Sequence, residues 1–204
     1  MNTSSEPPGA VSPSPEELAS RSQRGCQDSF AQLVQLYQNR IFNYLWRLTG
    51  NPHDAEDITQ DTFLKAYRAI HRFDGSGSFT SWLFIIAKRT GLNHLRDSRR
   101  EEVSEAADEI NHDSPAVLLE QTDEQQSLWA AARLLQQPEY EALWLRYGEG
   151  FSIAETARIM RTNPIRVRVL VHRARGHLAK LLKKADTVAV PTNRKGAGKN
   201  IDTH

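Results

Sequence analysis

Residues 161–184 read RTNPIRVRVLVHRARGHLAKLLKK, a stretch rich in Lys and Arg that contains no acidic residue. The chain as a whole is nearly neutral, with a formal net charge of +1 at pH 7. Cations gathered in one segment of a balanced chain indicate a surface that binds a polyanion. Whether this segment is a helix or a strand decides which fold presents the surface.

The segment starts with an alternating pattern but has helical periodicity over its full length. Residues 165–169, IRVRV, are typical of a β-strand when taken alone. In the longer window, apolar residues recur three and four positions apart and form one stripe on a helix. This stripe consists of Val167, Leu170, Val171, Ala174, Leu178 and Leu181. Because Asn163 and Pro164 also suit an N-cap and a first helical position, the sequence predicts a basic amphipathic helix.

A shorter helix is predicted directly before the basic one. Ser152 and Glu155 have the spacing of a capping box, and the helix that they start ends near Met160. Two short helices joined by a tight turn have the dimensions of a helix-turn-helix, whose second helix enters the major groove of DNA. A basic helix that is only solvated, or docked on protein, is the alternative at this point.

The side of the basic helix opposite its apolar stripe carries the side chains that would meet DNA. Arginines on both flanks can reach phosphates or guanine edges, and Ile165 and Val169 can contact thymine methyl groups. The predicted DNA-binding residues are Arg161, Asn163, Ile165, Arg166, Arg168, Val169, His172, Arg173 and Arg175.

The first half of the chain also has helical periodicity. Apolar residues recur at helical spacing over residues 30–48, and the breaker Gly-Asn-Pro follows at 50–52. Further helices are predicted at about residues 54–71 and 80–97, on either side of the loop FDGSGSF. Another is expected from Pro138 to Tyr147. We therefore predict an all-α protein.

Composition divides the chain into two small helical domains joined by a flexible acidic linker. Residues 101–126 contain many acids and no Lys or Arg, whereas both ends of the chain have the polar composition of disordered segments. The predicted segments are a disordered tail at 1–24, a first domain at 25–100, the linker at 101–121, a second domain at 122–185 and a disordered tail at 186–204.

Composition also argues against several classes of protein. Cys26 is the only cysteine, which excludes a disulfide framework and a cysteine-rich zinc site. No apolar run approaches the length of a membrane span and no secretory signal is visible, so a cytoplasmic protein without membrane contact is expected. The acids beside His53 suit a helix start rather than a metal site. We expect no enzyme activity, metal or cofactor.

Two long stretches resemble one known family. Residues 54–100, DAEDITQDTFLKAYRAIHRFDGSGSFTSWLFIIAKRTGLNHLRDSRR, closely resemble region 2 of the extracytoplasmic-function (ECF) sigma factors of bacterial RNA polymerase. Residues 138–182, PEYEALWLRYGEGFSIAETARIMRTNPIRVRVLVHRARGHLAKLL, resemble region 4 of the same factors. With the first predicted helix, the resemblance covers residues 28–182. It implies an alternative sigma factor that binds core RNA polymerase and directs promoter-specific initiation.

The region 2 resemblance implies two binding surfaces. The helix at residues 54–70 would bind the clamp helices of the largest polymerase subunit through Asp57, Gln60 and Asp61, although an ordinary solvated face has the same pattern. The next loop and helix would melt the minus-ten element and capture flipped bases, which requires a flexible backbone, stacking surfaces and cations. Some aromatics must instead be core, and Phe79 and Trp82 are expected to be buried. The predicted minus-ten residues are Phe73, Gly75, Ser76, Gly77, Ser78, Trp82, Lys88, Arg89 and Arg96.

The sequence departs from the family pattern at two places. Arg89 stands where members commonly carry asparagine, so a phosphate contact is expected there rather than a base contact. The frequent Thr-Val-Lys-Ser-Arg-Leu of the recognition helix appears as RVRVLV at residues 166–171, which keeps a cation at Arg168 but loses the hydroxyls. The minus-thirty-five preference of relatives therefore does not transfer to this chain.

The resemblance also implies partners. These are core RNA polymerase, through its clamp helices and flap, promoter DNA at the minus-ten and minus-thirty-five elements, and an anti-sigma factor as regulator. The acidic linker would thread through the polymerase channel, or act as a solvated spacer. The competing function is a helix-turn-helix regulator that binds operators without joining polymerase, and the predicted clamp-binding helix argues against it.

Overall fold

The computed structural model describes residues 13–102 and 123–189, with side chains placed for residues 13–98 and 128–183. All elements in these ranges are helical, in agreement with the predicted all-α class. In chain order they are α1 (Pro15–Gln23), α2 (Gln27–Thr49), α3 (Pro52–Ala69), the 3-10 turn η1 (Ile70–Arg72), α4 (Phe79–Glu102), α5 (Asp123–Ala132), α6 (Gln137–Leu143), the π-helical turn η2 (Trp144–Gly148), α7 (Ile153–Ile159) and α8 (Pro164–Ala189).

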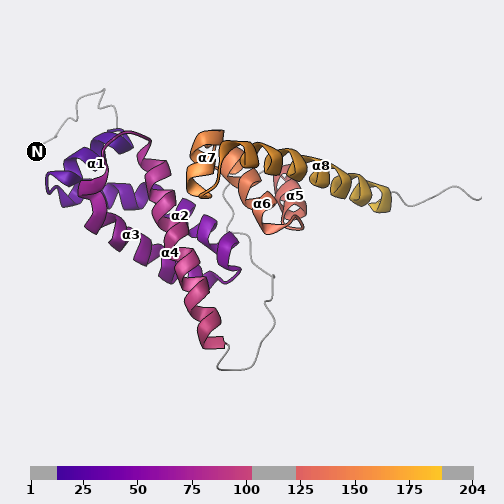
Figure 1. Cartoon of the computed structure of the whole chain (residues 1–204), viewed down its shortest axis with the longest axis horizontal. Helices are drawn as coiled ribbons and strands as arrows, with labels where there is room; N and C mark the ends of the chain where they lie inside the picture. Colours follow the sequence, from indigo (N-terminus) through magenta and orange to yellow (C-terminus); the bar gives the residue numbers. More distant parts are fainter. Residues whose placement is uncertain (1–12, 103–122, 190–204) are drawn as a thin grey trace, which may run out of the picture.

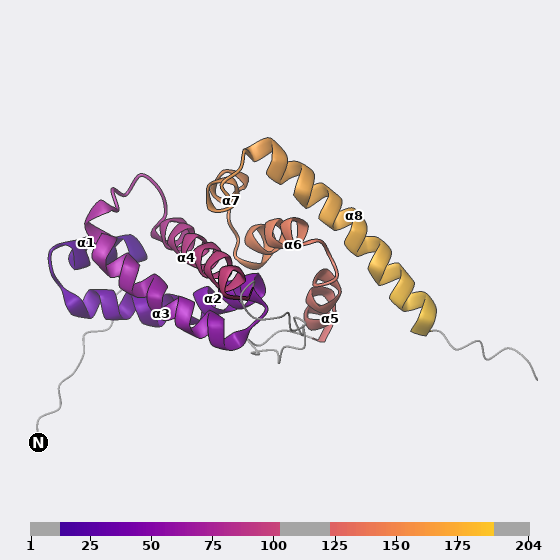
Figure 2. The ribbon, with the colours of Figure 1, turned by 60° about the horizontal axis from the view of Figure 1, so that its bottom comes forward.

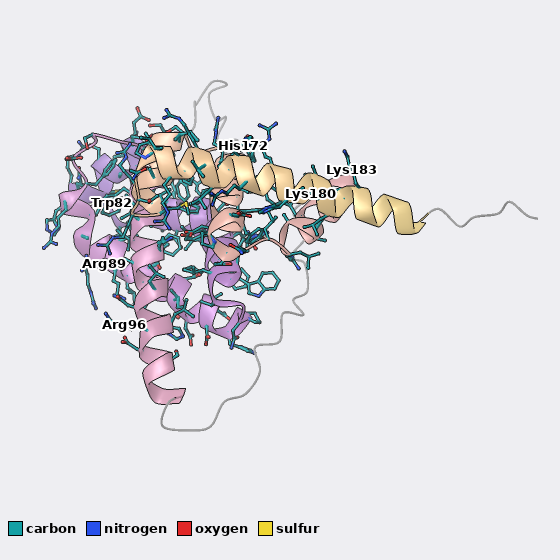
Figure 3. The ribbon with its side chains drawn as sticks, turned by 45° about the vertical axis from the view of Figure 1, so that its right-hand side comes forward. Trp82, Arg89, Arg96, His172, Lys180 and Lys183 are labelled. Atoms are coloured by element: carbon teal, nitrogen blue, oxygen red, sulfur yellow. The ribbon has the colours of Figure 1, made fainter. Side chains whose placement is uncertain are left out.

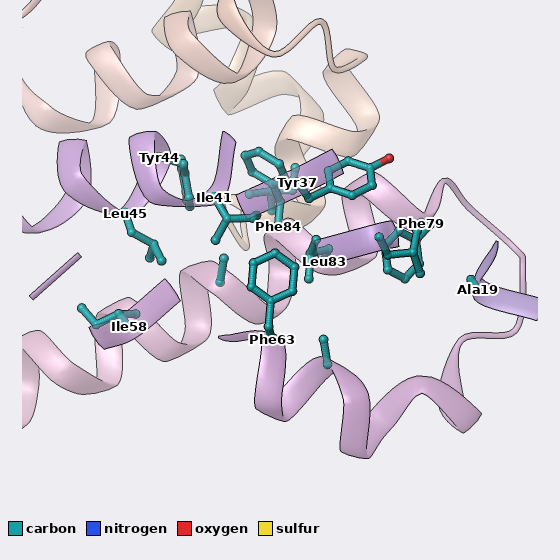
Figure 4. Close-up of a cluster of buried hydrophobic side chains, with 14 of the residues drawn as sticks. Ala19, Tyr37, Ile41, Tyr44, Leu45, Ile58, Phe63, Phe79, Leu83 and Phe84 are labelled. Carbon is teal, nitrogen blue, oxygen red and sulfur yellow. The ribbon is translucent and has the colours of Figure 1, made fainter. Parts of the chain in front are cut away.

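The helices form two bundles, α1–α4 and α5–α8, which we call the first and the second bundle (Figure 1). In the first bundle, the apolar stripes of α2, α3 and α4 face one another and build a shared core (Figure 4). Gly50 ends α2 in the left-handed conformation, with φ of 76°, which glycine adopts without steric cost. The Asn51 side chain then accepts from the backbone N–H of His53 and starts α3.

The N-terminal segment corrects one prediction. Residues 13–24 are not a disordered tail, because Pro15–Gln23 form α1; the first twelve residues of the predicted tail lie outside the described ranges. A capping box starts the helix: Ser14 and Glu17 exchange side-chain and backbone hydrogen bonds at 3.0 and 3.2 Å. Leu18 and Ala19 are fully buried in the first bundle. A Pro- and Ser-rich stretch thus contained a helix start.

The second bundle has its own two small cores. Helices α5, α6 and α8 meet around Tyr140, Leu143 and Leu178, and α7 packs on α8 through Ala157 and Val167. The helix predicted at residues 138–147 is α6 with the π-helical turn η2 at its end. Helix α4 continues to residue 102 and α8 to residue 189, beyond the predicted ends of both domains. Residues 103–121 of the predicted linker (101–121) and residues 190–204 of the predicted tail (186–204) lie outside the described residues.

The two bundles pack against each other, which the sequence did not predict. Trp144, Leu145, Phe151 and Ile159 of the second bundle are buried in the core of the first. Phe151 meets the ring of Phe84 edge to face, with ring centroids 5.0 Å apart. Helix α7 lies beside α4, and the long α8 extends from it along the outer side of the second bundle (Figure 2).

Candidate polymerase and nucleic-acid interfaces

An acidic groove lies between α3 and α4. Asp57, Gln60 and Asp61, the residues predicted to bind polymerase, are exposed on α3 and line a groove of about 540 Å³. Leu64 shares this groove, with 53% of its surface exposed, and Tyr67 is exposed one turn further along α3. A surface that combines carboxylates with exposed apolar side chains suits a partner that is both basic and apolar.

The loop between η1 and α4 has a buried base and an exposed tip. Gly75 and Ser76 are exposed, Gly77 and Ser78 are half-buried, and we call residues 74–78 the recognition loop. Asp74 accepts from the Ser76 N–H at 2.9 Å, and these hydrogen bonds from Ser76 hold the pKa of Asp74 below its usual value. Gly75 has φ of 72°, a conformation that favours glycine at this tip.

Aromatic rings fill the base of the recognition loop. Phe73 and Phe79 flank the loop in the sequence, and their rings meet edge to face with centroids 5.6 Å apart. Both are buried, so Phe73 is anchored in the core rather than exposed as a stacking surface. Phe79 is buried as expected, whereas Trp82 is only half-buried and leaves part of its ring accessible.

The three predicted cations of α4 have different environments. Arg89 and Arg96 are exposed along α4, where they can reach a phosphate backbone (Figure 3). Lys88 is buried, because it lies one helical turn after Phe84 on the side that faces the second bundle. Its ammonium group pairs with the Glu141 carboxylate of α6. The sequence predicts that Lys88 contacts DNA, and this prediction is wrong for the packed arrangement of the two bundles, in which Lys88 is not accessible.

Glu141 is a residue that the sequence analysis missed. It is buried in the middle of α6 and also accepts a hydrogen bond from the Tyr44 hydroxyl at 2.8 Å. Burial, together with the Glu141 charge, raises the pKa of Tyr44 well above its usual value. The only signal in the sequence is an acid among apolar and aromatic neighbours, at a position that helical periodicity would bury.

Further polar contacts join the bundles. Arg40 pairs with Glu149 at 2.9 Å, and the Arg47 guanidinium lies 3.6 Å from the centroid of the Trp144 ring. Ser78 of the recognition loop donates to Glu155 of α7 at 2.9 Å. The recognition loop is therefore directly connected to the first helix of the helix-turn-helix in this structure.

Local signals set the geometry of the helix-turn-helix. The predicted capping box of α7 is present, with Glu155 accepting from the Ser152 N–H at 3.0 Å. Partial burial opposes ionisation of Glu155, but hydrogen bonds from Ser152 and Ser78 and the Arg158 charge outweigh it and lower its pKa. Asn163 accepts from the Arg166 N–H at 2.7 Å and so caps α8 as predicted. Its side chain is used as a helix cap, which limits its role in base contacts.

The outer face of α8 carries the remaining predicted DNA-binding residues. Ile165 and Val169 lie one turn apart on this face, with 70% and 43% of their surfaces exposed, while Val167 is fully buried on the opposite side. His172, Lys180 and Lys183 continue along the exposed sides of α8 (Figure 3). The other exposed members of the predicted set are Arg161, Arg166, Arg168, Arg173 and Arg175. The structure therefore presents one basic face with an apolar centre.

The sequence matches two known family descriptions. Residues 33–101 match Sigma-70 region 2, and residues 125–178 match Sigma-70, region 4. The chain is 36% identical over 172 residues to the ECF RNA polymerase sigma factor BldN of Streptomyces coelicolor, a match that spans 81% of this chain and 65% of BldN. It is 28% identical to the ECF sigma factor SigW of Bacillus subtilis, over 78% of this chain and 92% of SigW. The chain belongs to the ECF sigma factors.

Solved structures agree with this assignment. The sigma factor RpoE, from its complex with the anti-sigma factor NepR of Bartonella quintana, superposes with a TM-score of 0.67 and 26% identity. That match covers 76% of this chain and 96% of RpoE. CnrH, from its complex with the cytosolic domain of CnrY, gives a TM-score of 0.57 and 26% identity, over 82% of this chain and 96% of CnrH.

As an alternative sigma factor, the protein binds core RNA polymerase and directs promoter-specific transcription initiation. The competing function of an operator-binding regulator that does not join polymerase is not favoured. Among the helices of residues 13–102 and 123–189, none is long and apolar enough to cross a membrane. Within the same ranges, no group of three or more His, Cys, Asp or Glu residues could hold a metal ion.

Proposed function

We propose that this sigma factor uses three separate surfaces in initiation. The groove between α3 and α4 binds the clamp helices of core polymerase, the recognition loop with α4 captures the minus-ten element, and the outer face of α8 binds the minus-thirty-five element. The observation that carries the proposal is the placement of an acidic, partly apolar groove and a basic helix face on different bundles of one chain.

The polymerase contact is supported by the composition of the α3 face. Asp57 and Asp61 provide charges for basic side chains, and Gln60 can both donate and accept hydrogen bonds. Leu64 and Tyr67 provide apolar surface that is exposed in the free factor. Charge complementarity would orient the encounter, and burial of the apolar groups would contribute affinity.

The minus-ten contact combines backbone, ring and charge. Gly75, Ser76 and Gly77 allow close approach of an unstacked base to the backbone of the recognition loop, next to the half-exposed Trp82. Arg89 and Arg96 are placed for the phosphates of the same strand. Lys88 can join them only after the second bundle moves away from α4, since Glu141 now covers it.

The minus-thirty-five contact uses both the flanks and the centre of α8. Its arginines are proposed to bind phosphates or guanine edges, and Ile165 and Val169 to contact thymine methyl groups. Asn163 acts mainly by fixing the first turn of the helix. Because Arg168 lies on the flank rather than at the centre of the face, base reading and phosphate binding are both within its reach.

We further propose the context in which these surfaces act. A region 2 domain ends at residue 100, and a region 4 domain begins at residue 122. Helix α1 belongs to the first of these domains, and the second also contacts the polymerase flap. The complexes of RpoE with NepR and of CnrH with CnrY support an anti-sigma factor as a regulator of this chain. The factor would work in the cytoplasm, beside polymerase and chromosome, without catalytic chemistry of its own.

The test is a reconstitution. The purified protein is mixed with bacterial core RNA polymerase, any complex is isolated, and transcription is run on a fragment library of the host genome. We expect a stable complex and new start sites whose upstream sequences align at two elements. Specific DNA binding by a protein that forms no complex with polymerase would contradict the proposal.

A further inference from the structure

Helix α1 contacts both ends of the recognition loop. On the entry side, the Gln23 side-chain amide donates to the backbone oxygens of Ile70 and Phe73, at 3.0 and 2.5 Å. On the exit side, Glu16 accepts from the backbone N–H of Phe79 at 3.0 Å. The Phe73 oxygen and the Phe79 N–H lie immediately before and after residues 74–78, and Ile70 lies one turn earlier, at the start of η1. A single helix of nine residues therefore contacts both ends of the loop, where the rings of Phe73 and Phe79 also pack on each other.

Helix α1 is itself held firmly in the first bundle. Leu18 is 1% exposed and Ala19 is fully buried, and Ala19 lies at the same end of the core as Phe79 (Figure 4). Ser22 is also buried, and its hydroxyl donates to the Leu18 backbone oxygen at 2.8 Å. Because the middle of the helix is anchored, Glu16 and Gln23 at its two ends are held at fixed positions.

The recognition loop has little structure of its own. Its tip is held by the Asp74–Ser76 turn, and residues 74–78 include two glycines, which have the largest conformational freedom of any residue. A loop that must close around an extruded base loses entropy on binding unless its ends are fixed beforehand. Glu16 also places a carboxylate at the positive N-terminus of α4, which stabilises the first turn of the helix that follows the loop.

We propose that α1 is a positioning element for base capture, in which Gln23 and Glu16 hold the recognition loop in the shape that accepts an unstacked promoter base. This inference rests on the proposed minus-ten function of the loop. Neither residue is assigned a DNA contact, since both act on the backbone of the loop ends. Both also precede residue 33, where the match to Sigma-70 region 2 begins, so the family match does not include this device.

The test uses holoenzyme on a promoter found by the reconstitution, with 2-aminopurine placed in turn at each minus-ten position of the non-template strand. Fluorescence reports the unstacking and capture of each base. In Gln23→Glu, a carboxylate of the same shape replaces the amide and faces two carbonyl oxygens. We expect the captured fraction to fall about tenfold, as for loss of more than one hydrogen bond. Core polymerase affinity and binding to a minus-thirty-five duplex should stay within about twofold of wild type.

Two matched controls separate positioning from stability and charge. Gln35→Glu makes the same charge change at an exposed site on α2, and it should behave as wild type. Glu16→Gln keeps an acceptor oxygen for the Phe79 N–H and should retain most of the capture, whereas Glu16→Ala should lose it. This pair remains informative even if Gln23→Glu fails to fold.

The outcomes distinguish the inference from the function on which it rests. If wild-type holoenzyme unstacks no base at the minus-ten element, the proposed function of the loop is wrong. If wild type captures a base and both Gln23→Glu and Glu16→Ala capture it equally well, the positioning role of α1 is wrong. If polymerase binding, duplex binding and capture all fall together with thermal stability, α1 has a structural role only and the inference is also overturned.

Discussion

Helices α4 and α8 both carry surfaces that we propose bind DNA, and each has a capped backbone N–H in its first turn, but the caps have different origins. In α8, the Arg166 N–H is capped by Asn163, three residues away in the sequence. In α4, the Phe79 N–H is capped by Glu16, which lies 63 residues away on α1. Ser78 caps a later amide of α4 locally, yet the same serine also donates to Glu155 of the second bundle.

This difference means that the two surfaces depend on the rest of the molecule to different degrees. Helix α8 is positioned by its own cap and by the contact of Val167 with α7, which in turn packs on the first bundle through Ile159. The recognition loop is positioned by α1 on one side and touches the second bundle on the other. Changes elsewhere in the chain should therefore alter minus-ten binding while leaving minus-thirty-five binding intact.

The largest effect is expected from Glu141→Ala. Removing one partner of a buried ion pair leaves Lys88 uncompensated, which costs about 3–5 kcal/mol if the interface stays closed. We expect the bundles to separate instead and Lys88 to become hydrated. Small-angle scattering should show a larger radius of gyration, and binding to single-stranded minus-ten DNA should tighten. An unchanged radius of gyration with weaker single-strand binding would show that the contact with Glu141 does not keep Lys88 from binding DNA.

The next largest effect is expected on polymerase binding by the exposed face of α3, a helix that, like α8, begins with a local cap. The double charge reversal Asp57→Lys and Asp61→Lys should weaken core polymerase binding by about 10- to 100-fold, since a hydrogen bond to a charged group contributes about 1.5–3 kcal/mol. Competition for core polymerase against the wild-type factor measures the change. Binding of the variant to a minus-thirty-five duplex serves as the control and should not change. Unchanged holoenzyme assembly would remove this face from the polymerase interface.

The same distinction between local and distant contacts explains which features of the fold and the site could be predicted from the sequence. Ser152 with Glu155, and Asn163 with Pro164, are local signals, and the helices that they start are present as predicted. Helix α1 also has local signals, but they lie within a Pro- and Ser-rich stretch whose composition is typical of disorder. The burial of Lys88 could not be predicted, because its partner is 53 residues away and the packing of the two bundles decides it.

Arg168→Ala tests the proposed minus-thirty-five surface on α8, the helix whose cap is local. If Arg168 contacts a guanine, we expect promoter affinity to fall by about 1–3 kcal/mol, mainly at one base position. If it contacts phosphate, the loss should be similar for all sequences and should lower the salt dependence of binding. Gel-shift titrations over salt and base substitution distinguish the two cases. Base capture at the minus-ten element should be unaffected, and no loss of affinity would exclude Arg168 from the interface.

The smallest effect is expected from Asn163→Ala. Loss of an N-cap typically costs about 1 kcal/mol of stability, here confined to the first turn of α8. Chemical denaturation of the variant should show a loss of this size, with a modest decrease in minus-thirty-five affinity. Restoration of both properties in Asn163→Asp would confirm that the cap is responsible, and a large decrease in affinity without loss of stability would indicate a direct base contact instead.

The most direct test of the distinction between the two helices is hydrogen exchange at the capped amides in their first turns. In Glu16→Ala, the Phe79 amide should exchange about tenfold faster or more, because it loses a hydrogen bond to a charged acceptor. The Arg166 amide should exchange as in wild type, and Asn163→Ala should show the reverse pattern. If the Phe79 amide exchanges at the wild-type rate in Glu16→Ala, α1 does not position the start of α4, and the dependence of the recognition loop on a distant helix is contradicted.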